Sequence, residues 1–313
     1  MPLFGGSPLV LLSWSTAAGS AVNVSEAIMK IIHFCAGLEQ SNGMANTARQ
    51  FVEEDRARGD ESEVTNDLSR ISSGVDKVVI HGAWLPLLWK AAKRAKEVGA
   101  WLVMRPAGSY DPVRLAFHGW KKRLVSVWEH RMLRRADVLL ATCGAERKWI
   151  LDYEPKATVE ITDLKRFFRV DADGRGPSVG TRRGDALHVL YLGRRHPLKG
   201  VGFLQRAVAE IESKSEAGRR TVELKIVSGH FGEELERDWE WCEVLCLPTL
   251  SENFGRVVAE ALERGKRVIT TDGAPAWGAY FTEHPDRGVY ISGFRDGDDS
   301  FRVASLVKAL KDV

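Results

Sequence analysis

The sequence predicts an α/β protein made of two parallel-sheet domains, on three observations. Short apolar runs alternate with amphipathic stretches along the chain, the pattern of strands and helices in parallel sheets. The chain has 313 residues, of which 44% are hydrophobic and 28% charged, enough for two globular domains of ordinary size. A polar segment rich in Gly, Arg and Asp, residues 169–185, has no periodicity. We therefore expect a domain at 29–168, a linker at 169–185 and a domain at 186–313.

Residues 1–28 precede this pattern. Their apolar run has no basic segment before it, and glycine and proline residues interrupt it, so it is too short to span a membrane. The first strand pattern follows Met29 directly, and we interpret Met29 as the functional start. Residues 1–28 are then a disordered extension. A weak signal peptide is the alternative, and the mature N-terminus, measured by mass spectrometry, separates the two interpretations.

The elements expected in the first domain alternate from Met29 onward. In open α/β sheets the carboxyl ends of the strands line the ligand cleft, so His81 and Arg105 are candidates for contacts with a sugar or an acceptor. A single histidine at a strand end is, however, more often packed or hydrogen-bonded than catalytic. The loop after the first strand lacks G-x-G-x-x-G, which argues against a dinucleotide oxidoreductase. The expected strands are 30–34, 78–81, 102–105 and 138–142, and the expected helices are 45–57, 85–98 and 117–135.

Residues 187–206 combine a strand, a glycine turn, two cations and a helix. A turn of this kind grips phosphate because backbone N–H groups and cationic side chains converge on the anion. Arg195 and His196 in the same loop are interpreted as solvated residues. The strand is expected at 187–192, and the motif residues that follow it are Gly193-Arg194 and Lys199-Gly200.

Residues 247–271 place two glutamates around the start of a helix. The amino end of a helix attracts anions, and a carboxylate beside it accepts sugar hydroxyls, so Glu252 and Glu260 suit a phosphorylated sugar. Two ordinary acids on a surface helix are the alternative when this segment is taken alone. We expect a buried strand at 244–247, capping side chains at Ser251–Asn253, a helix that opens at Phe254-Gly255 and ends at Gly265, and the next strand at 268–271.

These segments, in this order, resemble the C-terminal half of the retaining glycosyltransferases of family 4, which have the GT-B fold. The family carries a G-R-x(4)-K-G turn, which stands here as Gly193-Arg194…Lys199-Gly200. It also carries an E-x(7)-E element, which stands here as Glu252…Glu260. The segment TTDGAPAW at 270–277 is similar to the one that follows in the family. The resemblance is specific over about residues 187–277 and fainter in the N-terminal half.

The resemblance implies two Rossmann-like domains that face a cleft, with a nucleotide-sugar-binding domain at the C-terminus. It implies transfer of a sugar, with retention, from a nucleotide sugar to a hydroxyl of a glycan or lipid-linked glycan, in cell-envelope polysaccharide biosynthesis. In the family the leaving phosphate takes the acceptor proton, so we name no general base. We expect no cofactor besides the nucleotide-sugar substrate and no metal. Asp171-x-Asp173 is formally a DxD sequence, the metal motif of a different glycosyltransferase fold, but it lies in the linker rather than at a strand end.

The resemblance also assigns residues to the site. Arg194, Lys199 and Glu252 are the catalytic candidates, with the two cations on the leaving diphosphate and Glu252 beside the donor sugar. Glu260 is expected to hold the ribose hydroxyls. Ala107 stands where the family often has a basic residue that touches the sugar. The donor-binding candidates are Gly43, which fits a plain turn glycine equally well, Asn253, Phe254, Gly255 and Glu260; His81 and Arg105 are weaker candidates on the acceptor or sugar side.

The chain also departs from the family. Between Val227 and Val244 the family has another strand–helix unit or more, and the chain ends at Val313, before the family's crossover helix. We therefore expect a shortened C-terminal domain. The competing function, from a different class, is a catalytically silent GT-B protein that binds a partner or a glycan. Binding of UDP or GDP discriminates between the two.

The segment 117–135 bears on partners and location. It joins six cations to Trp120 and Trp128 at helical spacing, which fits either an anionic membrane surface or a domain helix with its apolar face in the core. The net charge of +3 is too small to indicate nucleic-acid binding. Four cysteines without a disulfide or CxxC pattern indicate a reducing compartment. We expect a cytoplasmic protein, with peripheral attachment to the inner face of the cytoplasmic membrane as a further candidate.

Overall fold

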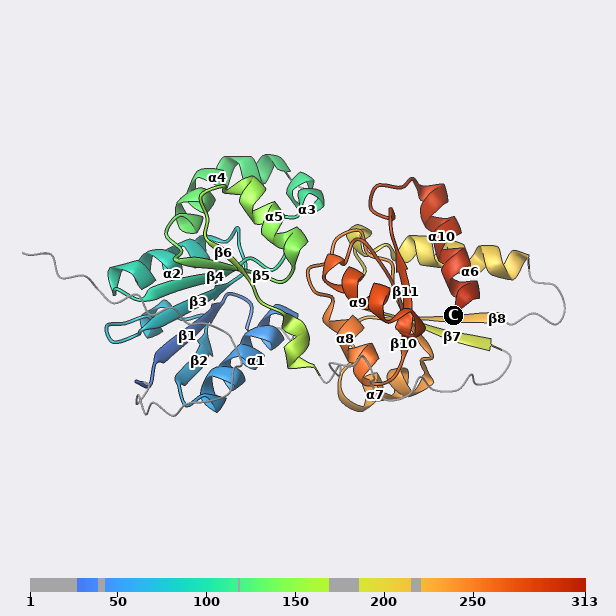
Figure 1. Cartoon of the computed structure of the whole chain (residues 1–313), viewed down its shortest axis with the longest axis horizontal. Coiled ribbons are helices and arrows are strands. Elements are labelled where there is room, and N and C mark those ends of the chain that lie inside the picture. Colours follow the sequence, from blue (N-terminus) through green and yellow to red (C-terminus); the bar gives the residue numbers. More distant parts are fainter. Residues whose placement is uncertain (1–26, 39–42, 118, 169–185, 215–220) are drawn as a thin grey trace, which may run out of the picture.

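A computed structural model describes residues 27–38, 43–117, 119–168, 186–214 and 221–313 (Figure 1). Residues 1–26, which make up nearly all of the expected extension, lie outside the described residues. The expected linker at 169–185 also lies outside them, together with Asp171-x-Asp173. The described residues form two α/β domains, each built on one parallel sheet (Figure 1).

The N-terminal domain contains a six-stranded parallel sheet in the order β2-β1-β3-β4-β5-β6. Its central strands are buried almost throughout, as expected of a parallel sheet with helices on both faces. The strands are β1 (Lys30–Cys35), β2 (Glu61–Thr65), β3 (Lys77–His81), β4 (Trp101–Arg105), β5 (Val138–Ala141) and β6 (Val159–Ile161). The α-helices are α1 (Gly43–Ala57), α2 (Pro86–Glu97), α3 (Pro112–Ala116), α4 (Gly119–Leu133) and α5 (Gly144–Tyr153), with short 3₁₀ helices η1 (Leu68–Arg70) and η2 (Leu164–Phe167).

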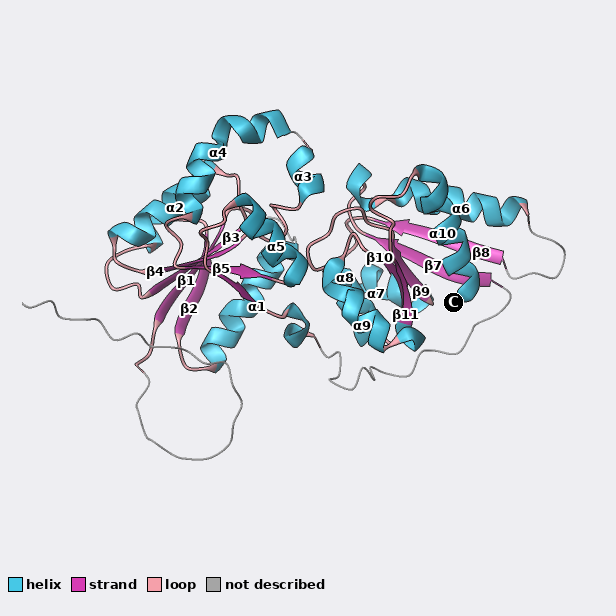
Figure 2. Ribbon diagram, turned by 45° about the horizontal axis from the view of Figure 1, so that its top comes forward, coloured by secondary structure: helices cyan, strands magenta, loops and turns pink. Residues whose placement is uncertain are grey.

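The C-terminal domain contains a five-stranded parallel sheet in the order β11-β10-β9-β7-β8 (Figure 2). The strands are β7 (Ala186–Leu192), β8 (Thr221–Val227), β9 (Val244–Leu247), β10 (Arg267–Thr271) and β11 (Gly288–Ile291). The α-helices are α6 (Val201–Ser213), α7 (Gly232–Trp241), α8 (Arg256–Glu263), α9 (Gly278–Glu283) and α10 (Asp299–Asp312), with η3 (Pro197–Lys199), η4 (Pro275–Trp277) and η5 (Pro285–Arg287).

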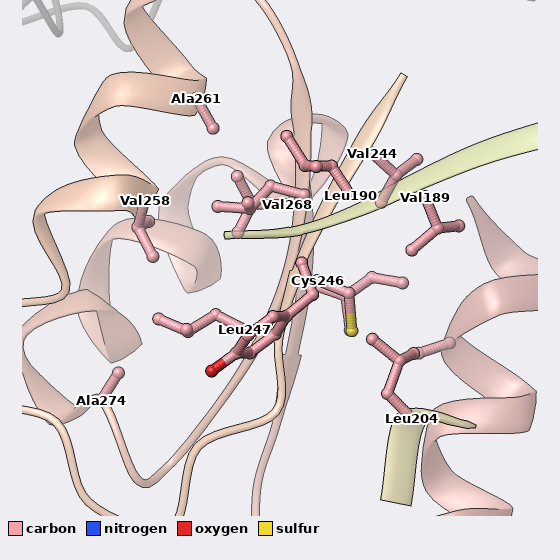
Figure 3. Packing of buried hydrophobic residues seen from close by; sticks show 14 of the residues in the cluster. Val189, Leu190, Leu204, Val244, Cys246, Leu247, Val258, Ala261, Val268 and Ala274 are labelled. Atoms are coloured by element: carbon pink, nitrogen blue, oxygen red, sulfur yellow. The ribbon is translucent and has the colours of Figure 1, made fainter. Parts of the chain in front are cut away.

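The core of the C-terminal domain lies between its sheet and the helices on either side. Leu190 and Val244 of the strands, with Val268 beside them, pack between α8 and α6 (Figure 3). Val258 and Ala261 project from α8, and these small side chains let the helix approach the sheet closely. This packing fixes the amino end of α8 at the carboxyl edge of the sheet, next to the loop that carries Glu252.

The predicted fold class is confirmed, because both sheets are parallel and lie in separate α/β domains. The predicted strands agree with β1, β3, β4, β5, β7, β9 and β10 to within one residue at each end. The stretch between β8 and β9 holds the single helix α7, consistent with the expected shortening.

The helix expected at 117–135 is α4, and its apolar residues do not lie in the core. Trp120, Leu124 and Trp128 are 64%, 67% and 51% exposed, and Val127 is exposed with them. Met132 and Leu133, at the end of the helix, are buried instead. The alternative in which this apolar face packs into the core is therefore wrong for the first two and a half turns. None of the helices in the described ranges has the length and hydropathy that crossing a membrane requires.

Candidate active site

The loop after β9 carries Glu252 to the junction of the two domains. Ser251 Oγ donates to Asp111 Oδ2 at 2.5 Å and accepts a bond from Arg114 Nε at 2.9 Å. Asn253 Oδ1 accepts a bond from Thr142 Oγ1 at 2.8 Å. The two neighbours of Glu252 are thus both held by the N-terminal domain.

These contacts correct the prediction that Ser251–Asn253 cap the helix. The helix α8 begins at Arg256, and its N-cap is Gly255 at φ 67°, without a side-chain cap among the described residues. The two polar side chains instead bond to partners in the other domain, which local sequence does not reveal. The amino end of α8 therefore presents backbone N–H groups that no side chain occupies in the described part of the chain, an arrangement that favours anions.

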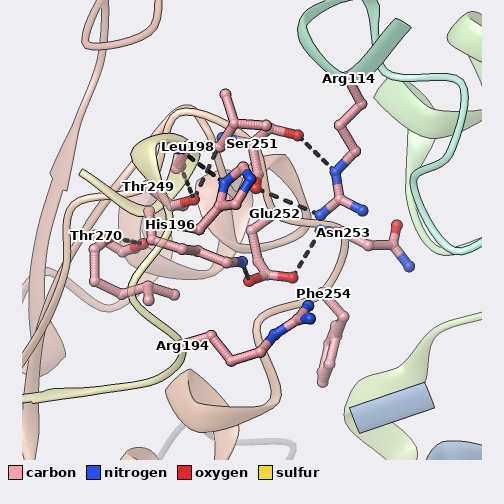
Figure 4. A network of polar contacts seen from close by, with 12 residues as sticks. Arg114, Arg194, His196, Leu198, Thr249, Ser251, Glu252, Asn253, Phe254 and Thr270 are labelled. Carbon is pink, nitrogen blue, oxygen red and sulfur yellow. Dashed lines mark hydrogen bonds and ion pairs between the residues drawn. The ribbon is translucent and has the colours of Figure 1, made fainter. Parts of the chain in front are cut away.

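The Glu252 carboxylate forms an ion pair with Lys199 (Figure 4). Burial favours a higher pKa for Glu252, but the charges of Lys199 and Arg114 outweigh it, so the pKa of this carboxyl lies below its ordinary value. Asn253 N donates to Glu252 Oε1 at 3.1 Å, and Glu252 N donates to Gly273 O at 2.7 Å. The turn that carries Lys199 and the loop that carries Glu252 therefore lie against each other.

Two glycines allow the loop after β9 to pack closely against the turns on either side of it. Gly200 has φ 67°, and a Cβ there would lie 1.8 Å from Pro248 O, so only glycine lets the Lys199 turn pack on the loop after β9. Leu250 N donates to Leu198 O at 2.8 Å across the same contact. A Cβ on Gly273 would lie 2.0 Å from Thr249 O, so this glycine admits the same loop from the other side.

Arg194 follows the turn glycine after β7 and is exposed. Its side chain points toward Glu252 and Phe254 (Figure 4). Tyr191 Oη donates to Arg194 O at 2.9 Å, which holds the turn. Phe254 is buried and packs on Trp277, with ring centroids 5.1 Å apart, so its side chain supports the loop from below. The Arg194 side chain thus projects toward the loop that carries Glu252.

Glu260 lies one turn into α8 and is half-buried. Its carboxylate is 3.7 Å from Arg256 Nε. Burial raises the pKa of Glu260, against the opposing charges of Arg256 and Arg264. Across the domain junction, a Cβ on Gly43 would lie 3.4 Å from Arg256 Cδ, so the start of α1 faces the start of α8. Gly43 and Glu260 therefore both lie beside Arg256.

The two weaker candidates lie deeper than expected. His81 and Arg105 are the last residues of β3 and β4 and are register partners. They are 1% and 3% exposed, so the strand ends that carry them are covered, chiefly by α1.

Sequence reasoning missed the residues that join the domains. Asp111 accepts a bond from Arg295 Nη2 at 2.7 Å as well as from Ser251, and it also caps α3 by accepting from Val113 N. Arg295 in turn lies over the Trp149 ring at 5.1 Å. The Asp111-Pro112 pair was a visible helix-start signal, but nothing local indicates a partner more than a hundred residues away.

A cavity opens on the surface of the N-terminal domain. It has a volume of about 730 Å³ and lies among α3, α4 and the loop after β3. Lys122 Nζ, in its wall, bonds to Arg114 O, and the Arg114 side chain reaches Ser251. The cavity is thus one residue away from the Glu252 loop. It is lined by Trp84, Leu115, Ala116, Gly119, Trp120, Lys122, Arg123, Ser126 and Tyr153.

Comparisons with known proteins find similar sequences and folds. Residues 58–161 match the family model described as "Glycosyl transferase 4-like domain". The chain is 28% identical over 221 residues to D-inositol 3-phosphate glycosyltransferase 2 of Catenulispora acidiphila, covering 58% of this chain and 51% of that protein. It is 25% identical over 219 residues to D-inositol 3-phosphate glycosyltransferase of Rhodococcus erythropolis, covering 58% and 48%. The matched part is thus about half the length of these curated relatives.

Solved structures supply the fold. Sucrose-phosphate synthase from Thermosynechococcus elongatus superposes with a TM-score of 0.63 at 16% identity, covering 91% of this chain and 89% of that one. WaaG, a glycosyltransferase involved in lipopolysaccharide biosynthesis, superposes with a TM-score of 0.58 at 14% identity, covering 91% and 90%. The chain has the GT-B fold of these structures, and its residues 58–161 are similar to the glycosyl transferase 4-like domain. The turn with Lys199 and the loop with Glu252 both belong to the C-terminal domain. Their junction with the N-terminal domain forms the candidate site.

Proposed function

We propose that this GT-B protein transfers a sugar from a nucleotide sugar to a hydroxyl of a glycan or lipid-linked glycan, with retention. The observation that carries the proposal is the Lys199–Glu252 pair beside the uncapped amino end of α8. Residues 186–313 serve as the donor domain and 29–168 as the acceptor-side domain. A role in cell-envelope polysaccharide biosynthesis is part of the same proposal.

The proposed chemistry rests on charge that develops during bond breaking. As the glycosidic bond to the diphosphate breaks, negative charge grows on the leaving oxygen. Lys199, Arg194 and the amino end of α8 lie where they stabilise that charge more in the transition state than in the ground state. Because these side chains supply the positive charge, the proposed reaction needs no metal ion.

The two glutamates have separate proposed roles. Lys199 pairs with Glu252, and a bound diphosphate would compete for the lysine and release the carboxylate to accept hydroxyls of the donor sugar. Glu260 lies farther along α8 beside Arg256, which Gly43 faces across the junction, and there it would accept the ribose hydroxyls.

The cavity beside α4 is the proposed acceptor site. Trp84 and Trp120 supply flat apolar faces that suit sugar rings, and Lys122 and Arg123 supply cations. The curated relatives are named for D-inositol 3-phosphate, an acceptor that this cavity would also accommodate by its charge. We favour a lipid-linked acceptor, because the exposed apolar residues of α4 begin at the rim of this cavity.

We propose that α4 attaches the protein to the anionic inner face of the cytoplasmic membrane. Trp120, Leu124, Val127 and Trp128 recur at helical spacing on one exposed face. Lys121, Arg123 and Arg131 are exposed beside them. Aromatic and aliphatic side chains flanked by cations fit the boundary between headgroups and acyl chains.

The test is donor binding followed by turnover. Isothermal titration with UDP and with GDP is expected to show binding of one nucleotide, after which a panel of the corresponding nucleotide sugars is assayed for release of the nucleotide. Lys199→Ala is expected to reduce turnover about 100-fold to 1,000-fold, the cost of removing one preorganised donor to a developing charge.

Arg195→Ala is the matched control, because Arg195 is an exposed cation in the same turn and turnover should persist. Thermal unfolding of both variants confirms that they fold. If neither nucleotide binds to the wild type, the catalytically silent alternative is correct. Wild-type turnover in Lys199→Ala would instead reject the assignment of this residue.

A further inference from the structure

The edge strand β8 is longer than the strands at the other sheet edges. The C-terminal sheet ends at β8 on one side and at β11 on the other, and the N-terminal sheet ends at β2 and β6 (Figure 2). β8 has 7 residues, whereas β2 has 5, β11 has 4 and β6 has 3. Proteins usually keep edge strands short or interrupt them, because a long edge strand pairs readily with another chain. β8 contains neither proline nor glycine, so no residue of its own interrupts such pairing.

The place of β8 in the sheet explains why this edge is open. In a complete doubly wound sheet the strands follow the order 3-2-1-4-5-6. With β7 and β8 as the first two strands and β9 to β11 as the last three, the observed order lacks the third strand, whose place is beside β8. Residues 228–243 are all described, and the single regular element among them is the helix α7. β8 is therefore an edge strand where the full sheet would give it a neighbour on both sides.

The backbone groups that β8 turns to its open edge follow from its pairing with β7. Val227 O accepts from Gly193 N at the end of β7, and successive residues of a strand turn their N–H and C=O groups to alternate sides. The odd-numbered residues of β8 therefore bond to β7. The N–H and C=O groups of Val222, Leu224 and Ile226 point to the open edge, and no group in the described part of the chain bonds to them.

The side chains of β8 are complementary to the same strand in reverse. In an antiparallel pair centred on Leu224, Glu223 lies opposite Lys225 of a second copy, and Val222 lies opposite Ile226. Opposite charges and β-branched residues in directly opposite positions stabilise paired strands. The same register sets the outward N–H and C=O groups of the even-numbered residues opposite one another. The backbone bonds and the side chains therefore agree on one register.

The two charges also disfavour the neighbouring registers. A shift of the second copy by two residues keeps even-numbered residues opposite one another, so the backbone bonds remain possible. In one direction the shift places Glu223 opposite its own copy, and in the other direction it places Lys225 opposite its own copy. Like charges directly opposite each other destabilise a strand pair. The side chains of Glu223 and Lys225 are 59% and 44% exposed, so both are accessible at this edge.

We propose that β8 pairs with β8 of a second copy of this chain, antiparallel and centred on Leu224, so that two five-stranded sheets become one continuous sheet. The contact has a two-fold axis between the two Leu224 residues and is therefore self-complementary. Each copy uses its β8 edge once, so association stops at the dimer. None of the residues in this contact belongs to the candidate active site, so failure of the proposed function leaves this proposal intact.

Sedimentation velocity of the full chain, in a concentration series that reaches about 0.1 mM, tests the proposal. The wild type is expected to change from monomer to dimer and to form nothing larger. Glu223→Lys should weaken the dimer about tenfold or more, because it places like charges opposite each other at both ends of the contact. Glu61→Lys is the matched control, since it reverses an exposed charge on the edge strand β2 and should leave the association unchanged.

A mixture of two variants tests the register itself. Lys225→Glu also places like charges opposite each other, so this variant alone should associate as weakly as Glu223→Lys. In an equimolar mixture of the two, each lysine faces a glutamate, and a mixed dimer should form with an affinity close to that of the wild type. A general loss of folding would not be restored by mixing.

Leu224→Pro is the second variant, because Lys225→Glu also removes the bond of Lys225 to Asp238. Proline at this position removes an outward N–H and no bond to β7, and edge strands tolerate it there. The variant should unfold cooperatively and remain a monomer. Hydrogen exchange of the peptide 221–227 gives an independent signal, because its outward amides should exchange more slowly in the wild-type dimer than in Glu223→Lys.

Three results would overturn the proposal. A wild type that is monomeric throughout the series would mean that the two charges protect the edge from pairing. A dimer that persists in both Leu224→Pro and Glu223→Lys would lie on another surface. A mixture of folded Glu223→Lys and Lys225→Glu that forms no dimer would exclude the register centred on Leu224.

Discussion

The two walls of the domain junction, one around Lys199 and Glu252 and the other around His81 and Arg105, differ in how their charged and polar groups are paired. On the C-terminal wall, Lys199 and Glu252 neutralise each other, and the loop around them is tied by backbone bonds. On the N-terminal wall, Arg105 and His81 are more deeply buried and leave polar atoms without partners among the described residues. A paired wall is stable when empty but must rearrange to bind, whereas an unpaired wall loses stability when empty and regains it with a ligand.

Asp111 connects the two walls, and its loss should have the largest effect on stability. Asp111→Ala leaves Arg295 mostly buried without its carboxylate and releases Ser251. We expect a loss of about 3 kcal/mol in the free energy of unfolding, the lower end for breaking a buried pair because Arg295 keeps some contact with water. Urea unfolding followed by tryptophan fluorescence measures it, and UDP or GDP affinity should fall as the Glu252 loop loosens.

The matched control for this prediction is Asp298→Ala. Asp298 caps α10 by accepting from Phe301 N at 2.7 Å, and within the described residues it bonds to none of the N-terminal domain. Losing a cap alone costs about 1 kcal/mol. If Asp111→Ala costs no more than Asp298→Ala, Asp111 acts only as the cap of α3, and the two walls are not coupled through it.

The exposed face of α4 is a second place where the N-terminal domain leaves apolar surface open to solvent. Replacing Trp120, Leu124 and Trp128 together by Ser should reduce binding to vesicles that contain anionic phospholipid at least tenfold, because it removes the apolar area that would enter the headgroup region. Sedimentation with vesicles of neutral and of mixed neutral and anionic lipid measures this. Binding of the wild type should weaken as salt rises, because the flanking cations act through screened charge.

Phe231→Ser combined with Phe301→Ser controls for loss of exposed apolar surface elsewhere, since both side chains are exposed in the C-terminal domain. This variant should bind vesicles like the wild type. Equal loss in both variants would mean that α4 has no special role. Because the α4 residues are exposed, the triple variant should retain the unfolding midpoint of the wild type.

The sequence predicted the C-terminal wall better than the N-terminal one, for a physical reason. Lys199 and Glu252 lie in two short motifs whose spacing is fixed by strand–turn–helix geometry, so their meeting follows from local structure. Asp111, by contrast, meets Ser251 only because two domains close on each other. The capping prediction for Ser251 and Asn253 was wrong for the same reason, since partners in the other domain outcompeted the helix end. β6 was missed because Val159–Ile161 is too short and exposed to show a pattern.

The smallest expected effect concerns pH and the Asp55–His33–His81 chain. Burial lowers the pKa of His33 below its ordinary value of 6.5, and burial with the charges of His33 and Arg105 lowers the pKa of His81 further. Below pH 6.5 the unfolded chain therefore binds more protons than the folded chain, so stability should fall as pH drops from 6.5 and stay level above it. The slope is at most about 1.4 kcal/mol per pH unit for each histidine.

His81→Asn should flatten part of this slope, because the amide still donates to His33 and does not titrate. Urea unfolding at pH 7.5, 6.5, 6.0 and 5.5 measures the slope, and His230→Asn, a partly exposed histidine beside Asp238, should keep it. An unchanged slope in His81→Asn would mean that the fold does not oppose protonation of His81. The description of His81 as a neutral, buried group beside Arg105 would then be wrong. The same experiment therefore tests the unpaired character of the N-terminal wall without any ligand.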